Sequence, residues 1–296
     1  MGVRSAPRAR GAPIALPAAL VLTGAVSVQA GAGIAARLFD QVPPAAVTTL
    51  RLWAAALIML AVGGRGAARA VAGLARRRAW RDAVATTAFG IALAFMNFAI
   101  YQAFARIPLG IAVTIEFLGP LAVAVAGARR LASLAWVALA AAGVLLLAKG
   151  SGGQLNLAGV AFALLAAAGW AGYIVLSRAT GQRLAGPSGL VIAMCVAAVL
   201  VTAPGVVAGA PQMFRPEVLA TGVAIGLLSS VIPYWLEFEA LRLVPARVFG
   251  VWMSMQPAVA ALIGLTMLGQ RLSVAEWAGI CCVAVASGGA ARGQAR

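Results

Sequence analysis

Long apolar segments succeed one another through almost the whole of this 296-residue chain, separated by short loops that hold most of its charges. A helix needs about 20 apolar residues to cross about 30 Å of hydrocarbon, where only helices and closed barrels satisfy their own backbone. The chain is 63% hydrophobic with a mean hydropathy of +0.98, which excludes a soluble globular protein. Short alternating strands are absent, so we predict an all-α integral membrane protein and not a barrel.

Ten segments are apolar and long enough to be predicted as membrane-spanning helices. They cover about residues 14–38, 46–63, 83–105, 108–127, 132–149, 156–177, 188–209, 217–241, 247–268 and 274–290. The first follows a basic stretch and contains the small-residue pattern Val28-Gln29-Ala30, as signal peptides do. Because the apolar run continues past Ala30 to Leu38, we expect it to stay in the protein as a span.

Basic residues are distributed unevenly between the two sides that ten spans define. With the N-terminus in the cytoplasm, 17 of the 23 Lys and Arg residues face the cytoplasm. These are Arg4, Arg8, Arg10, Arg65, Arg69, Arg76, Arg77, Arg78, Arg81, Arg129, Arg130, Arg178, Arg183, Arg242, Arg247, Arg292 and Arg296. Cytoplasmic loops carry this excess in membrane proteins, so both termini are predicted to be cytoplasmic. The net charge of +16 therefore needs no nucleic-acid partner.

The two halves of the chain resemble each other at a nearly constant offset. The first contains RIPLG, EFLGP and RLASLAW, and the second RLVPA, SMQPA and RLSVAEW. Pro108 and Pro245 differ by 137 positions, and so do Pro120 and Pro257. Because five spans per half is an odd number, the second copy enters the membrane from the opposite face, as an inverted repeat. The predicted divisions are a basic N-terminus (1–13), two five-helix repeats (14–149 and 150–290) and a cytoplasmic tail (291–296).

A carboxylate, Glu116, lies near the middle of the fourth predicted span. A charge at the bilayer centre costs at least ~2.5 kcal/mol, so such residues usually face a bundle interior or a water-filled path. Pro120 has no N–H to donate to the carbonyl of Glu116, which leaves that carbonyl and the carboxylate free at one place. We interpret this as a site for which a proton and an ammonium group compete. The alternative is a structural carboxylate that bonds to another helix.

Other polar residues in the predicted spans are candidate substrate contacts. Asn97 and Tyr101 lie four apart on one helix face, where they either line a cavity or join two helices. Gln256, in the ninth span, occupies a place equivalent to the first-half site and is expected to hold a substrate carboxylate. Ser254 is a weaker candidate, because serine commonly bonds back to its own helix.

The eighth span adds Tyr234 and Glu237, which follow Pro233. Glu239, nearer the cytoplasmic end of the same span, is expected to form an interfacial salt bridge with Arg242.

Three further residues are assigned mechanical or electrostatic roles. Pro120 and Pro257 occupy equivalent places in the two halves and are predicted to act as hinges or to expose carbonyl groups. Arg51, one turn inside the second span, is expected to snorkel outward. The alternative for Arg51 is that it attracts a carboxylate substrate.

Several classes of chemistry find no support. The chain has no histidine, and Cys195, Cys281 and Cys282 all lie in apolar spans, so no disulfide framework, metal or cofactor is predicted. Seven acidic residues without histidine provide no set of nucleophile, base and orienting group, which argues against an enzyme. A non-transporting scaffold or receptor would need a soluble domain or a long loop. The oligomeric state stays open.

Two motifs resemble a known family. PLGIAVTIEFLGPLAVA (108–124) and IPYWLEFEALRLVPARVFGVWMSMQPAVAALIGLTMLGQRL (232–272) look like the EamA-type drug/metabolite transporter superfamily, most closely its threonine/homoserine exporter (RhtA-like) family. The resemblance extends over essentially the whole chain. It implies a ten-helix, 5+5 inverted-repeat secondary transporter of a bacterial-type inner (plasma) membrane that exports small amino acids in exchange for protons.

The chain departs from the family pattern at two positions. Gln256 stands where the family commonly has Glu, and Gln270 where many members read LGE, so proton coupling would depend more on Glu116. An alternative on the same fold is export of another metabolite or of a cationic or aromatic drug. Aromatic side chains that could stack on such a drug are Trp235, Tyr234, Phe117 and Tyr101.

Overall fold

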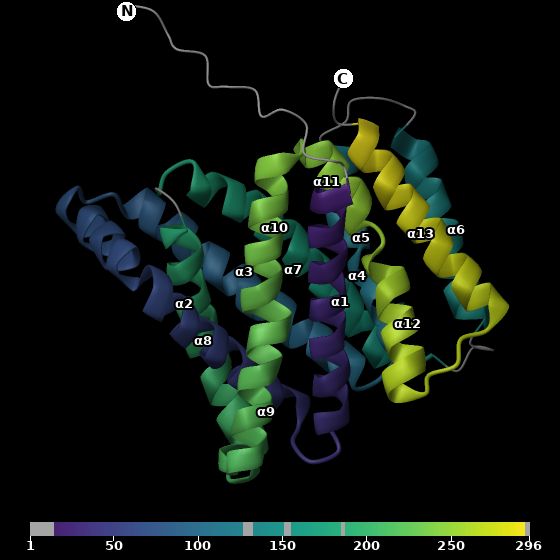
Figure 1. Cartoon of the computed structure of the whole chain (residues 1–296), viewed down its shortest axis with the longest axis horizontal. Coiled ribbons are helices and arrows are strands. Elements are labelled where there is room, and N and C mark those ends of the chain that lie inside the picture. The colour runs from purple at the N-terminus through teal and green to yellow at the C-terminus, as the bar shows by residue number, and fades with distance from the viewer. Residues whose placement is uncertain (1–14, 127–132, 151–154, 185–186, 294–296) are drawn as a thin grey trace, which may run out of the picture.

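The computed structural model describes residues 15–126, 133–150, 155–184 and 187–293. Within these ranges the chain is a bundle of helices without strands (Figure 1). Nine helical stretches of the described chain are long and apolar enough to cross a membrane, and a tenth, Leu134–Gly150, is slightly shorter. The ten correspond to the ten predicted spans, so the all-α membrane fold is confirmed. The predicted N-terminus (1–13) and arginines 4, 8, 10, 129, 130 and 296 lie outside the described residues.

The helices follow one another through short connections. The first half comprises α1 (Ala15–Leu38), α2 (Pro44–Arg76), α3 (Trp80–Phe104), α4 (Leu109–Glu116), α5 (Leu118–Ala126) and α6 (Ser133–Gly150). The second comprises α7 (Leu157–Gly181), α8 (Ser188–Gly209), η1 (Gln212–Phe214), α9 (Pro216–Gly226), η2 (Leu227–Val231), α10 (Ile232–Leu243), α11 (Ala246–Met253), α12 (Gln256–Leu268) and α13 (Val274–Gly293). Helix α1 begins and α13 ends at the same end of the bundle (Figure 1).

The sequence predicts that the second span ends near residue 63, but α2 continues to Arg76. The apolar run stops near residue 63, but residues 64–76 are rich in alanine and arginine, which are strong helix formers. The helix therefore continues without interruption beyond the apolar segment. Arg76 is its last residue and Arg77 its C-cap. Arg78 then adopts a left-handed φ of 48°, which is common just after a helix.

Two spans are each broken into two helices near their middle. The fourth divides between Glu116 and Leu118, and the ninth between Met253 and Gln256. The proline of each break lies in the first turn of the following helix, where its missing N–H would have no helical partner. The breaks lie beside Pro120 and Pro257, the two residues for which the sequence predicts a hinge or an exposed carbonyl.

The eighth span contains an irregularity that the sequence did not predict. Between α9 and α10 the backbone forms a π-helical turn, η2, which contains the buried Ser229 and Ser230. Pro233 follows directly, and its missing N–H removes one of the hydrogen bonds that would keep the helix regular. Such π turns inside helices are frequent at functional sites.

Packing joins the two halves through a small set of helix pairs. Helix α2 packs on α8, α4 on α12 and α6 on α13, while α3 packs on α7 and α1 on α10 (Figure 1). Small residues allow these close approaches: a Cβ on Gly143 of α6 would lie 2.8 Å from the carbonyl oxygen of Gly279 in α13. The arrangement leaves a cavity where the broken spans meet the other helices.

Candidate functional site

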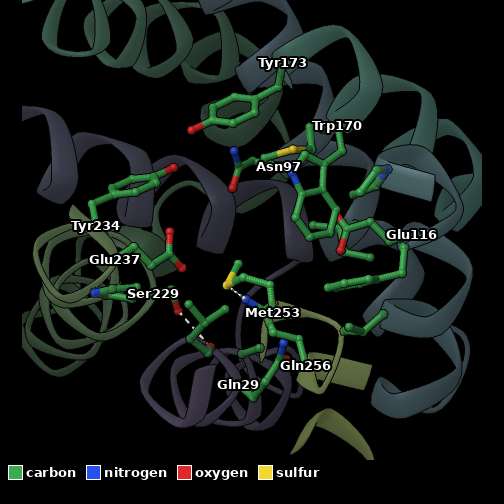
Figure 2. Close-up of a pocket in the computed structure, with 18 of the residues that line it drawn as sticks. Gln29, Asn97, Glu116, Trp170, Tyr173, Ser229, Tyr234, Glu237, Met253 and Gln256 are labelled. Carbon is green, nitrogen blue, oxygen red and sulfur yellow. Dashed lines mark hydrogen bonds between the residues drawn. The ribbon is translucent and has the colours of Figure 1, made fainter. Parts of the chain in front are cut away.

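A cavity of about 540 Å³ lies inside the bundle, with walls from both halves of the chain. It is bounded by parts of α1, α2, α3, α4, α5, α7, η2, α10, α11 and α12. Figure 2 shows the polar side chains that point into it. Of the nine predicted site and hinge residues, seven line this cavity, namely Glu116, Gln256, Asn97, Tyr101, Tyr234, Glu237 and Pro120.

Glu116 is the last residue of α4, directly at the helix break. Its side chain is only 9% exposed, and among the described residues it forms no ion pair or hydrogen bond. The carboxylate lies in the cavity wall beside Trp170 of α7 (Figure 2). Trp170 in turn packs edge to face on Phe117, with ring centroids 4.9 Å apart. The helix break and this aromatic pair together position a carboxylate that forms no direct ion pair or hydrogen bond within the described part of the chain.

Asn97 and Tyr101 of α3 both line the cavity. The Nδ2 atom of Asn97 donates to the carbonyl of Leu93 at 2.8 Å, within its own helix. The ring of Tyr101 is fully buried, and its hydroxyl has no hydrogen-bond partner in the described chain. Within the described chain, neither side chain forms a hydrogen bond to another helix. Of the two alternatives for this pair, lining a cavity and joining two helices, the first matches their placement.

The second break contributes Gln256, the first residue of α12, whose Nε2 lies 3.5 Å from the sulfur of Met253 in the cavity wall. Ser254 and Pro257, by contrast, do not line the cavity. The Ser254 hydroxyl donates to the carbonyl of Val251 at 2.7 Å and faces α13 at Gly288. Ser254, predicted as a weaker substrate contact, therefore lies outside the cavity. Its hydroxyl bonds back to its own helix, as serine commonly does.

Helix α10 directs Tyr234 and Glu237 into the cavity, opposite Asn97 (Figure 2). The hydroxyl of Tyr234 points toward that of Tyr173 from α7. Trp235, between them in sequence, is 67% exposed on the outside of the bundle and does not line the cavity. An aromatic cargo would therefore not stack on it.

The predicted pair of Glu239 and Arg242 is present on the outside of the bundle, with Oε1 and Nη1 3.2 Å apart. The glutamate two positions earlier faces the cavity instead, because residues two apart in a helix cannot share a face.

Arg51 does not snorkel outward, which corrects the first expectation for this residue. Its side chain is 9% exposed and lines the cavity. Nη2 donates to the carbonyl of Ser229 at 3.0 Å, and Nε lies 3.4 Å from the hydroxyl of Ser230. The guanidinium also lies 5.2 Å from the centre of the Tyr101 ring. The carbonyl and hydroxyl of η2 and the face of an aromatic ring hold the charge inside, which a helix end facing open lipid could not do.

The residues of the cavity wall that were not predicted include Gln29, Trp170, Tyr173, Ser229 and Met253. Gln29 carried a usable signal, since an amide inside an apolar span generally has a polar partner or a function. In the sequence, Gln29 also belongs to the small-residue pattern Val28-Gln29-Ala30 that resembles a signal-peptide cleavage site. The other four are common in membrane helices, and only the packing shows which face of the helix they occupy.

Gln270, the second departure from the family pattern, has a structural role. Its Oε1 accepts a hydrogen bond from the backbone N–H of Leu109, the first residue of α4, at 2.9 Å. The first N–H groups of a helix have no partner within the helix, so this contact caps α4 from the other half of the chain. A neutral amide provides the acceptor as well as a carboxylate would.

The cavity lining reaches toward both ends of the bundle, since Phe104, the last residue of α3, also belongs to it. Ser177, Leu241 and Phe249 of the lining lie in α7, α10 and α11 near the end of the bundle at which α1 begins. Toward the other end, Phe104 and Ile107 are buried at 8% and 4% exposure. Within the described residues, no group of three His, Cys, Asp or Glu side chains is placed to hold a metal ion.

A bundle of membrane-spanning helices that encloses a cavity with two carboxylates and one guanidinium is the architecture of a membrane carrier for small polar molecules. A model of the EamA-like transporter family matches residues 157–290. The chain is also similar over nearly its whole length to curated members. It therefore belongs to the EamA-like transporter family.

The relatives are close enough to compare over full length. The threonine/homoserine exporter RhtA of Salmonella typhimurium (strain LT2) is 36% identical over 288 residues, which cover 94% of this chain and 92% of the relative. The exporter of the same name from Escherichia coli (strain K12) is 35% identical over 285 residues. The uncharacterized transporter YwfM of Bacillus subtilis is 31% identical over 148 residues, about half of each chain. A crystal structure with 20% identity superposes with a TM-score of 0.61 over 92% of this chain and 97% of the other, which shows the same fold.

Proposed function

We propose that the protein exports small amino acids, threonine or homoserine among them, across the inner (plasma) membrane of a bacterium in exchange for protons. The observation that carries this proposal is Glu116, an unpaired and buried carboxylate at a helix break in the wall of a large cavity. The names of the full-length relatives support the choice of cargo.

Exchange follows from competition for one group. A buried carboxylate without a partner is stabilised either by a proton or by a cation. A substrate ammonium that enters the cavity and binds Glu116 displaces the proton, and a proton from the other side displaces the substrate. Because only one of them can occupy the carboxylate, each crossing of substrate is coupled to a crossing of a proton in the opposite direction.

Movement of the two halves would alternate access to the cavity. We infer an inverted repeat, and two features support it. The breaks at α4/α5 and α11/α12 are separated by the same offset of 137 residues as the sequence repeats, since α4 ends at Glu116 and α11 at Met253. The packing of α3 on α7 is also matched by that of α1 on α10, as exchange of the halves requires. Pro120 and Pro257 would then act as hinges at the two breaks.

We infer that the cavity opens to one side of the membrane at a time. With the termini in the cytoplasm, as the arginine distribution predicts, Ser177, Leu241 and Phe249 would line its cytoplasmic part, and the buried Phe104 and Ile107 would close its outer side. This is the state in which an exporter loads its substrate.

A second cargo class fits one feature of the cavity. Trp170, Phe117, Tyr173 and Tyr234 surround two carboxylates, an arrangement that would also bind an aromatic or cationic drug. Competition experiments with hydrophobic cations and with toxic amino-acid analogues would separate the two cargo classes.

The proposal is tested by uptake of labelled threonine into inside-out vesicles that contain the full chain, with and without an acidic lumen. The wild type is expected to show uptake that depends on the pH gradient, and Glu116→Gln is expected to fall to the level of empty vesicles. Glu276→Gln is the matched control. Glu276 is equally buried, but its carboxylate accepts from the backbone of Ser273 at the start of α13, away from the cavity.

Gradient-driven uptake that survives in Glu116→Gln would refute the role of this carboxylate. Absence of threonine uptake by correctly inserted wild type would refute the cargo and leave the fold and the family unaffected.

A further inference from the structure

Arg51 places a positive charge inside a cavity whose other charged groups are carboxylates. Among the described residues that line the cavity it is the one basic side chain, and Glu116 and Glu237 are the two acidic ones. It lies near the start of α2, on the outer side of the cavity by the predicted orientation, and it reaches the interior through contacts with η2. Its charge is close enough to interact with Glu116.

No carboxylate of the chain neutralises this arginine. All seven acidic residues fall within the described ranges, and none of them forms an ion pair with Arg51. A buried charge without a direct ion-pair partner is costly, and a bound anion in contact with the guanidinium would offset that cost. An arginine that stays buried under these conditions is therefore a candidate anion-binding group.

The guanidinium is held in one orientation with part of its donor set unused. Of its five N–H groups, one on Nη2 bonds the Ser229 carbonyl and that on Nε faces the Ser230 hydroxyl. The remaining donors include N–H groups on both terminal nitrogens, which is the pair that a carboxylate accepts in a bidentate contact. The π-helical turn of η2 supplies the carbonyl that fixes this orientation.

Two further unpaired groups belong to residues that line the same cavity as Arg51. The hydroxyl of Tyr101 and the side-chain oxygen of Gln29 have no hydrogen-bond partner within the described chain, although both side chains are at least 98% buried. The Tyr101 ring packs against the guanidinium at 5.2 Å. Buried polar groups are almost always hydrogen-bonded in proteins, so these two unpaired oxygens are candidates for contact with a bound molecule.

We propose that Arg51 and the Tyr101 hydroxyl form a carboxylate-binding subsite, with Gln29 at its edge, so that the cavity recognises zwitterionic amino acids by both ends. The ammonium binds Glu116 and the carboxylate binds Arg51. This inference rests on the proposed function and adds its selectivity: amines that lack a carboxylate bind more weakly. It also assigns the carboxylate to Arg51 in place of Gln256, whose amide faces the sulfur of Met253.

The test is equilibrium binding of two labelled ligands, L-threonine and L-threonine amide, to the purified full chain in detergent. The two ligands share the ammonium group and the side chain and differ in the carboxylate. The wild type is expected to bind threonine at least tenfold more tightly than the amide. In Arg51→Gln, threonine affinity is expected to fall by about tenfold or more, with little change for the amide, because a charge-assisted pair is lost.

Two variants protect the test against misfolding of Arg51→Gln. Tyr101→Phe removes one unpaired hydroxyl from a packed ring and is expected to lower the preference for threonine in the same direction. Arg37→Gln is the matched control: Arg37 also donates to a carbonyl of the other half, that of Met267, but it lies outside the cavity. It is expected to keep the wild-type preference.

The outcomes separate the two claims. If the wild type binds threonine and its amide equally, or if Arg51→Gln and Tyr101→Phe weaken both ligands by the same factor, the carboxylate subsite is refuted and amino-acid export stands. If the wild type binds neither ligand, the proposed function fails, and this inference fails with it.

Discussion

Gly119→Ala should separate two helices that together support the cavity. A Cβ at Gly119 in α5 would lie 2.1 Å from the carbonyl oxygen of Ala167 in α7, whereas ordinary contacts begin at 3.4 Å. The missing distance is about 1.3 Å, and the obstacle is backbone, which no side-chain rotation can relieve. The helices must therefore move apart next to the Phe117–Trp170 pair, at the same end of α5 as Glu116.

The cost can be bounded from general values. Overpacking typically destabilises by about 1–3 kcal/mol, and the better helix propensity of alanine returns up to about 1 kcal/mol. We expect a net loss of about 1–2 kcal/mol in the free energy of unfolding. The loss should lower the thermal unfolding midpoint by several degrees. The rate of threonine transport should also fall at temperatures where the variant is still folded, because the cavity wall shifts with the helix.

The measurement is thermal unfolding of the purified protein together with vesicle uptake, beside Gly172→Ala. A Cβ at Gly172 of α7 would meet Ala92 at 3.7 Å, an ordinary contact, so this variant should match or slightly exceed the wild type in stability. Equal unfolding midpoints for Gly119→Ala and wild type would refute the close approach of α5 and α7.

Two further predictions concern single side chains. Gln270→Ala removes the cap on the N–H of Leu109 and should lower the free energy of unfolding by about 1 kcal/mol, whereas Gln270→Glu should keep the wild-type value. Thermal unfolding of both variants measures the difference, and an unchanged midpoint in the alanine variant would contradict the cap. Glu237→Gln should impair threonine uptake because it alters the cavity. Glu239→Gln breaks only an exposed pair with Arg242, worth less than about 1 kcal/mol, and should transport normally; equal uptake by both variants would contradict this assignment.

Much of the candidate site could be predicted from the exceptions to the apolar pattern. Glu116, Glu237 and Gln256 are polar groups in lipid-embedded segments, where a polar side chain must find the interior, and all three line the cavity. Ser254 shows the limit of this reasoning, because a serine satisfies itself on its own helix and its presence says nothing about its direction.

Arg51 marks a limit of a different kind. From the sequence its place near the end of an apolar segment favoured an outward direction, which is the usual solution for a long basic side chain. The structure turns it inward because η2, almost 180 positions later in the chain, presents a carbonyl and a hydroxyl there. No local pattern can predict a partner at that distance.

The sequence by itself determined the class of the protein, the ten spans, the midspan breaks and the carboxylate at the first break. These depend on properties that act locally: hydrocarbon length, the missing N–H of proline and the cost of a charge in lipid. Only the tertiary structure decided which faces meet at the cavity, the inward direction of Arg51 and the unpaired state of Tyr101. These depend on close packing between distant helices, where approach is governed by small residues and irregular turns that carry no periodic signal.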